Sequence, residues 1–147
     1  MISQKDGSPI VTNKRLCLAS ASPRRQALLA QVGIEPHTIV PADIDETPKD
    51  RELPAQLAAR LAFEKTLYVS ENTANEANML VLAADTVVSI GRRILPKTET
   101  RDAAHVCLTA LSGRGHRVST GVCLFAEGAC VAKRLVTSRV RMKTLDA

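Results

Sequence analysis

The chain has 147 residues, of which 45% are hydrophobic and 24% charged, and its net charge is +5. This composition predicts one ordinary globular domain that is large enough to bury its own core. Aromatic residues make up only 2% of the chain, and the basic residues are scattered. Both features disfavour a nucleic-acid-binding protein, which stacks bases on aromatic rings and gathers basic residues in runs. The positive charge favours a small anionic ligand instead.

The sequence also indicates a compartment. The first 13 residues lack the apolar stretch of a secretory signal, and no apolar run reaches the length of a membrane span. Its four cysteines form no C-x-x-C pair or zinc spacing. Three of them lie in apolar surroundings, which predicts buried, inert thiols in a reducing compartment. We expect a cytoplasmic protein without a membrane partner.

Residues 1–14 are predicted to be a flexible tail, and residues 15–147 a single domain. In chain order, the pattern then predicts a strand over 16–19, a helix over 23–31, a strand over 34–40 that Pro36 interrupts, and a longer helix over 54–70. We expect Ala27, Leu28 and Val32 to form the inner face of the first helix, and Gly33 to end it. In the longer helix, Leu57, Leu61 and Lys65 share one face.

The second half of the chain begins with a nearly continuous apolar run over 79–90, which predicts a central strand buried on both faces. A turn at Gly91 leads back to Ile94 and Leu95. Thr98 or Thr100 can cap a helix that ends at Leu111. Segments 116–125 and 129–142 then predict a hairpin. Helices interleaved with strands and followed by a hairpin indicate an α/β fold, with a mixed twisted β-sheet flanked by helices.

The segment LCLASASPRR carries the strongest single signal for a ligand site. Ser22 suits the cap of a helix and Pro23 its first position. Arg24 and Arg25 then lie in the first turn, where positive charge opposes the helix dipole. Free backbone N–H groups, the hydroxyls of Ser20 and Ser22 and two guanidiniums predict a phosphate site. A solvated helix start with two surface arginines explains the segment equally well.

Asp85 is the second signal, because it interrupts an apolar strand where a carboxylate is costly unless it is paired or binds a cation. We favour a general base or metal ligand over a structural role. Taken singly, Glu46, Lys65 and Lys97 fit plain structural roles better, and His116 fits a turn residue better than a base. Together, these acidic and basic groups match the requirements of phosphoryl chemistry.

Six short segments in this order resemble the Maf family of nucleoside triphosphate pyrophosphatases over roughly residues 16–142. They are LASASPRR (18–25), DE (45–46), AFEK (62–65), LAADTVV (82–88), ILPK (94–97) and LSGRGHRV (111–118). The resemblance implies hydrolysis of a nucleoside triphosphate to its monophosphate and pyrophosphate, with Mg²⁺ or Mn²⁺. It also implies a fold related to the inosine triphosphate pyrophosphatases.

The resemblance further implies roles for individual residues. Asp85 would be the general base that activates water, and Glu46, with Asp85, would hold the metal. The phosphate site would consist of Arg25, Lys65 and Lys97, beside the hydroxyls of Ser20 and Ser22. Arg24 and Thr86 would bear on base specificity, and they match the branch that acts on dTTP and UTP.

Two departures from the family pattern affect these expectations. Gly-Lys-Pro usually stands where this chain has Pro96-Lys97-Thr98, and proline restricts the backbone that aims Lys97. Family members also continue past residue 147 with a loop that adds a specificity residue and closes the cleft, so we expect a C-terminally shortened domain. A catalytically impaired form that binds nucleotide or a protein partner is the alternative. A homodimer is left open.

Overall fold

A computed structural model describes residues 14–74 and 76–146, so nearly all of the predicted tail lies outside the described residues. The elements are β1 (Arg15–Leu18), α1 (Pro23–Gln31), β2 (Thr38–Ile39), α2 (Pro54–Asn72), β3 (Met79–Ile90), β4 (Arg93–Leu95), α3 (Arg101–Leu111), β5 (Gly115–Ala126) and β6 (Ala129–Arg141). The predicted elements are confirmed to within about two residues, except β2. That strand keeps only two residues of the predicted 34–40.

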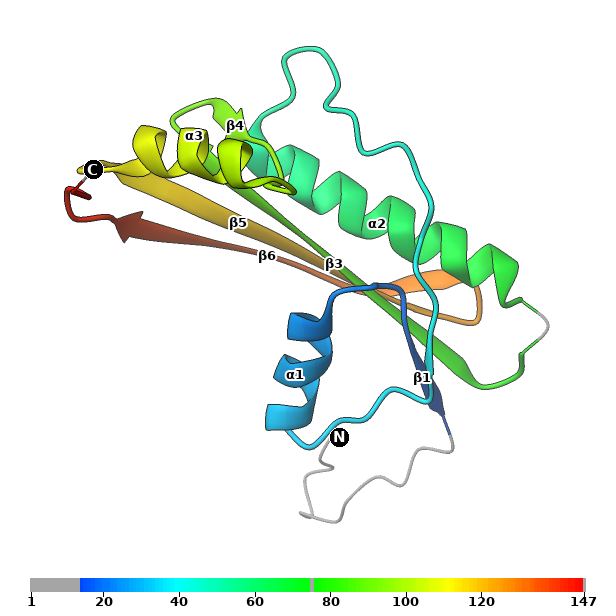
Figure 1. Ribbon diagram of the computed structural model, residues 1–147. Helices are drawn as coiled ribbons and strands as arrows, with labels where there is room; N and C mark the ends of the chain where they lie inside the picture. The colour runs from blue at the N-terminus through cyan, green and yellow to red at the C-terminus, as the bar shows by residue number, and fades with distance from the viewer. Residues whose placement is uncertain (1–13, 75, 147) are drawn as a thin grey trace, which may run out of the picture.

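The strands form one mixed sheet in the order β2-β1-β3-β5-β6, and β4 also pairs with β3 (Figure 1). Strand β1 is parallel to β2 and β3, whereas β3 is antiparallel to β4 and β5, and β5 to β6. The mixed sheet and the central place of β3 are confirmed. The prediction that β3 is buried on both faces is wrong, because its residues alternate between buried and half-buried.

Helix α2 covers one face of the sheet over β3 and β5 (Figure 1). Its predicted inner face is confirmed, since Leu57, Leu61 and Lys65 are all buried. The helix approaches β5 so closely that a Cβ on Gly121 would overlap the backbone of Ala58. This close approach lets side chains of α2 reach β3 directly.

Helix α1 lies on the opposite face, beside the even-numbered residues of β3. The predicted inner face is wrong: Leu28 is 53% and Val32 69% exposed, Ala27 is exposed too, and no residue of α1 is buried. The predicted residues do share one side of the helix, but they are buried only if another element of the fold covers that side. Gly33 ends the helix with a φ of +75°, as predicted.

The turns and caps of the second half agree with the sequence. Thr100 Oγ1 accepts a hydrogen bond from Ala103 N at 3.1 Å and caps α3. The β5–β6 turn uses positive φ at Glu127 and Gly128, which suits a tight hairpin. Among the described residues, no helix has the length and apolar character to cross a bilayer.

Three of the four cysteines are buried, as predicted, and Cys130 is exposed. All four are free thiols. Burial raises the pKa of the Cys123 thiol to about 11, so this thiol is a weak nucleophile near neutral pH.

Candidate active site

Strand β3 places Asp85 on the face that α2 covers. Asp85 is 3% exposed, and Lys65, from the inner face of α2, is 7% exposed. Lys65 Nζ donates a hydrogen bond to Asp85 Oδ1 at 2.7 Å. The ammonium therefore lies inside the protein as an ion-pair partner, rather than at the end of a side chain that only covers apolar surface.

The loop before α2 adds Glu46 to this pair. Lys65 Nζ lies 2.8 Å from Glu46 Oε1, and Lys97 Nζ lies 2.7 Å from Glu46 Oε2. Lysines and carboxylates thus alternate in one chain of contacts, Lys97–Glu46–Lys65–Asp85. Pro96 does not prevent Lys97 from reaching the cluster. A cavity of about 410 Å³ opens beside these side chains, lined by Glu46, Asp85 and Lys97 among others.

The charges of the cluster support one another. Burial acts to raise the pKa of the Glu46 carboxyl, but hydrogen bonds from Lys65 and Lys97 outweigh it and hold this pKa below its usual range. Within the described residues, no group of three or more His, Cys, Asp or Glu side chains could hold a metal ion. The cation-binding potential of the site therefore rests on two carboxylates that already share one ammonium.

The second part of the site lies across β3, on the α1 side. Arg25 Nη1 donates to Ser20 Oγ at 3.1 Å, and Nη2 donates to Thr86 Oγ1 at 3.5 Å. Burial lowers the pKa of the Arg25 guanidinium, and the charge of Asp85 acts against this shift. Because Asp85 and Thr86 are adjacent in β3, the strand connects the carboxylate on one face to the guanidinium on the other.

A cavity of about 530 Å³ lies between α1 and the sheet, and Arg24, Arg25 and Thr86 all line it. Its other lining residues are mostly aliphatic. The sequence interpretation missed Thr120, whose hydroxyl lies 3.1 Å from that of Thr86 and which lines the same cavity. Thr86 and Thr120 are register partners in β3 and β5, a pairing that follows only once the hairpin is placed beside β3.

Ser22 departs from its predicted role at the helix start. It occupies the N-cap position of α1, but its side chain makes no capping hydrogen bond. Instead, Ser20 Oγ accepts a hydrogen bond from Ser22 N at 3.1 Å. The hydroxyl that organises this turn is therefore that of Ser20.

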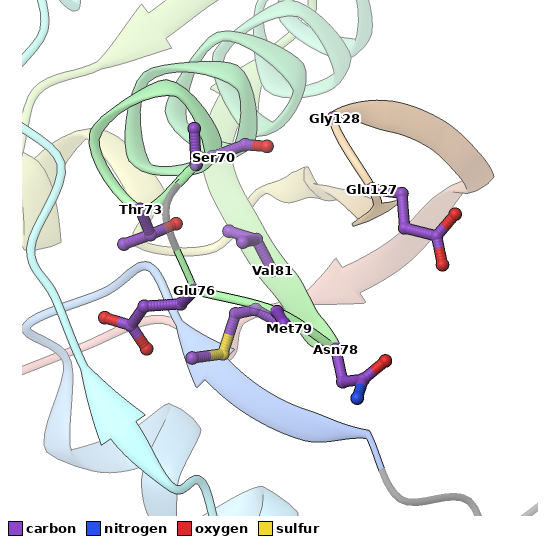
Figure 2. Close-up of a pocket in the computed structure, with 10 residues that line it drawn as sticks. Ser70, Thr73, Glu76, Asn78, Met79, Val81, Glu127 and Gly128 are labelled. Atoms are coloured by element: carbon purple, nitrogen blue, oxygen red, sulfur yellow. The ribbon is translucent and has the colours of Figure 1, made fainter.

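A further pocket, of about 320 Å³, lies at the other end of β3, where α2 ends and the β5–β6 turn approaches (Figure 2). It contains two carboxylates, but Figure 2 shows those of Glu76 and Glu127 pointing away from each other. Its lining, as far as the described part of the chain forms it, includes no lysine, arginine or histidine. The cluster around Asp85 is thus the stronger candidate for chemistry.

Comparisons with known proteins show which family this chain resembles. Residues 15–147 match the family described as Maf-like protein. A dTTP/UTP pyrophosphatase from Chelativorans sp. (strain BNC1) is 54% identical over 135 residues, covering 90% of this chain and 65% of its own length. One from Mesorhizobium japonicum is 55% identical with the same coverage. The chain therefore spans slightly less than two thirds of these relatives.

A solved structure with a similar fold is that of a HAM1 protein from Coxiella burnetii. Its TM-score is 0.56 at 16% identity, and the match covers 86% of this chain and 70% of that one. This likeness supports the α/β fold with a mixed sheet. From the match over residues 15–147, the chain belongs to the Maf-like protein family.

Proposed function

We propose that the chain carries the catalytic core of a nucleoside triphosphate pyrophosphatase that converts dTTP and UTP to the monophosphate and pyrophosphate. The observation that carries this proposal is the buried Asp85 carboxylate, ion-paired to Lys65 beside a cavity that Glu46 and Lys97 also line. The names of the relatives from Chelativorans and Mesorhizobium supply the substrate class.

In the proposed reaction, Asp85 accepts a proton from the water that attacks the α-phosphorus. The new bond joins the water oxygen to phosphorus, the bond from the α-phosphorus to the bridging oxygen breaks, and pyrophosphate leaves. Lys65 supports this role, because a cation 2.7 Å from Oδ1 favours the ionised carboxylate that a base requires.

The triphosphate would be held by Arg25, Lys65 and Lys97, beside the hydroxyls of Ser20 and Ser22 and the amides at the start of α1. The two lysines and two carboxylates cancel in formal charge, so the cluster alone offers little net charge to a triphosphate. Arg25 adds a guanidinium that bonds only hydroxyls within the described part of the chain and can therefore turn to a phosphate.

A divalent cation, Mg²⁺ or Mn²⁺, completes the proposal, with Glu46 and Asp85 as its protein ligands. Carboxylate oxygens suit these ions, and Mg²⁺ is commonly held by one or two carboxylates together with substrate phosphates. The ammonium shared by Glu46 and Asp85 supports this fit, since it shows that both carboxylates face one cationic position. When bound, the metal would neutralise phosphate charge.

Base selection is assigned to Arg24 and Thr86. Both line the mostly apolar cavity next to α1, which can accept a nucleobase while the phosphates lie toward Asp85. The four free thiols support a cytoplasmic setting for this reaction.

The proposal is tested by incubating the purified chain with dTTP, UTP, CTP, GTP and 7-methyl-GTP, with Mg²⁺ or Mn²⁺, and measuring pyrophosphate release. We expect turnover of dTTP and UTP, and a loss of at least about 100-fold in Asp85→Asn with nucleotide binding retained. Asp43→Asn, which changes an exposed carboxylate of the Glu46 loop, is the matched control. A nucleotide-induced rise in melting temperature without any pyrophosphate release would favour the binding-module alternative.

A further inference from the structure

The polar side chains beside the cavity between α1 and the sheet form one connected set of hydrogen bonds. Arg25 Nη1 donates to Ser20 Oγ at 3.1 Å, and Nη2 donates to Thr86 Oγ1 at 3.5 Å. The Thr86 hydroxyl lies 3.1 Å from that of Thr120, its register partner on β5. The connection therefore runs from the start of α1, across β3, to Thr120.

The two threonines keep one hydroxyl hydrogen that they can donate to a ligand. A guanidinium has no acceptor, so Thr86 Oγ1 must accept the bond from Arg25. One of the two hydroxyl hydrogens lies between Thr86 and Thr120, whichever residue donates it. The described part of the chain offers neither hydroxyl a further partner. Both threonines are half-buried and line the cavity, so the remaining hydrogen is available to a ligand there.

The contact with Arg25 decides which hydroxyl keeps the free hydrogen. A hydroxyl that accepts a hydrogen bond from a cation becomes a better donor, because successive hydrogen bonds polarise one another. Thr86 is therefore the donor to Thr120, and the free hydrogen belongs to Thr120. A guanidinium carries five N–H donors, so Arg25 can keep this contact while its other N–H groups face a phosphate.

The rest of the lining restricts which ligand suits this hydrogen. Among the described residues, its other polar side chains are Arg24 and Arg25, which only donate, and its remaining side chains are aliphatic. Those residues contribute no carboxylate or side-chain amide. Such a lining favours a mostly apolar ring that carries carbonyl oxygens. Uracil and thymine have a carbonyl where cytosine has an amino group, which is a donor.

We propose that Thr120 is a further specificity-determining residue, whose hydroxyl donates a hydrogen bond to the base carbonyl that uracil and thymine have and cytosine lacks. This inference rests on the proposed function, because it places the base in the cavity next to α1. Thr86 orients the Thr120 hydroxyl, and Arg25 orients that of Thr86. A cytosine amino group at the same position would face a donor instead of an acceptor.

The test measures equilibrium binding of dTMP, dUMP and dCMP to the full chain by calorimetry, so it does not depend on turnover. We expect Thr120→Val, which removes the hydroxyl at nearly constant size, to weaken the binding of dTMP and dUMP about tenfold. Binding of dCMP should change less than about twofold, so the preference for dTMP over dCMP should fall. Thr120→Ala should reproduce this loss, and Thr120→Ser, which keeps the hydroxyl, should retain the preference.

A second pair of hydroxyls supplies the matched control. Ser119 Oγ lies 3.2 Å from Thr137 Oγ1, and these residues pair between β5 and β6. Ser119 directly precedes Thr120 in β5, so its side chain points to the opposite face of the sheet. Thr137→Val therefore removes a hydroxyl from a similar pair and should leave all three affinities within about twofold. Circular dichroism would verify that each variant folds.

Two results would overturn the role of Thr120. They are a wild type that does not prefer dTMP to dCMP, and a Thr120→Val variant that keeps the wild-type preference. Pyrophosphate release by the wild type tests the proposed function separately. Turnover of dTTP and UTP with an unchanged preference in Thr120→Val would overturn only this inference. Selective binding of dTMP that Thr120→Val abolishes, without any turnover by the wild type, would support the inference and overturn the proposed catalysis.

Discussion

The helices α1 and α2 both begin with proline and both direct a cation toward β3, yet they relate to the sheet in different ways. Helix α2 buries nine of its residues, whereas α1 buries none. Lys65 from α2 ion-pairs with Asp85 inside the protein, while Arg25 from α1 hydrogen-bonds to the hydroxyls of Ser20 and Thr86. The well-packed face thus holds a carboxylate in place. On the loosely covered face, the Arg25 guanidinium contacts no carboxylate of residues 14–74 and 76–146.

This comparison connects packing to the proposed chemistry. A general base needs a fixed position and restricted water, which burial under α2 provides for Asp85. A side chain that must receive a large ligand needs open space, which the cavity beside α1 provides. The following predictions test whether the difference between the two helices is energetic as well as geometric.

The largest effect is expected when the buried cation is removed. Lys65→Met leaves the Asp85 carboxylate without its ion-pair partner and should lower the free energy of unfolding by about 3–5 kcal/mol. Arg25→Gln on α1 loses only bonds to hydroxyls and should cost about 1 kcal/mol. Urea denaturation measures both, and the double variant Lys65→Met/Asp85→Asn should regain part of the loss. Equal losses in the free energy of unfolding for Lys65→Met and Arg25→Gln would contradict an energetic difference between α2 and α1.

The apolar faces offer a matched pair of leucines. Leu61→Ala in α2 removes a side chain that is 2% exposed and should destabilise the protein by about 3 kcal/mol. Leu28→Ala in α1 changes an exposed side chain and should stay within about 0.5 kcal/mol. Thermal unfolding followed by circular dichroism would compare the two, and a large loss at Leu28 would show that α1 is covered in solution.

The close approach of α2 to β5 can be tested at Gly121. Gly121→Ala places a methyl group against the backbone of Ala58, so the helix must shift, at a cost of about 1–3 kcal/mol. Gly115→Ala, on the same strand, meets its nearest atom at 3.9 Å and should be nearly neutral. Because a shifted α2 also moves Lys65, nucleotide turnover should fall further in Gly121→Ala than in Gly115→Ala. Similar stability in the two variants would contradict the close packing.

The smallest effect is expected on the outer side of α2, where Arg60 bonds Glu52. The hydrogen bond from Arg60 holds the pKa of the Glu52 carboxyl at about 2, against an ordinary value of 4.5. The folded protein thus binds fewer protons than the unfolded chain. The stabilisation, on the order of 1 kcal/mol, is fully present above about pH 4.5 and lost as the pH falls through 2.

Glu52→Gln should therefore be less stable than the wild type at pH 7 and equal to it near pH 2, as measured by urea denaturation at each pH. Asp50→Asn is the control, since Asp50 and Arg51 are almost fully exposed and 3.9 Å apart. Their pair should contribute nothing measurable. A difference between Glu52→Gln and the wild type that persists at pH 2 would exclude the ion pair as its cause.

Much of the fold could be predicted because the local signals agree with the tertiary structure. The apolar run over 79–90 is β3, the residue after Thr100 begins α3, and the hairpin turns at Glu127 and Gly128. The failures have one cause in common. The inner face of α1 and the two-sided burial of β3 both depend on which elements cover them, and periodicity within one segment does not contain that information.

In the candidate site, too, some features followed from the sequence and others depended on tertiary packing. Asp85 stood out by itself as a carboxylate in an apolar strand, whereas Glu46, Lys65 and Lys97 each fitted a plain structural role until the order of the motifs singled them out. Thr120 escaped notice, because only strand register brings it beside Thr86.

The sequence by itself determined the α/β class, the family and which side chains are available for phosphate chemistry, since these follow from local periodicity and from motifs in a given order. Only the tertiary structure decided that Lys65 pairs with two carboxylates and that Arg25 approaches β3 from the opposite face of the sheet. The physical reason is that ion pairing and burial depend on distances between segments far apart in the chain, which packing of the helices and sheet sets.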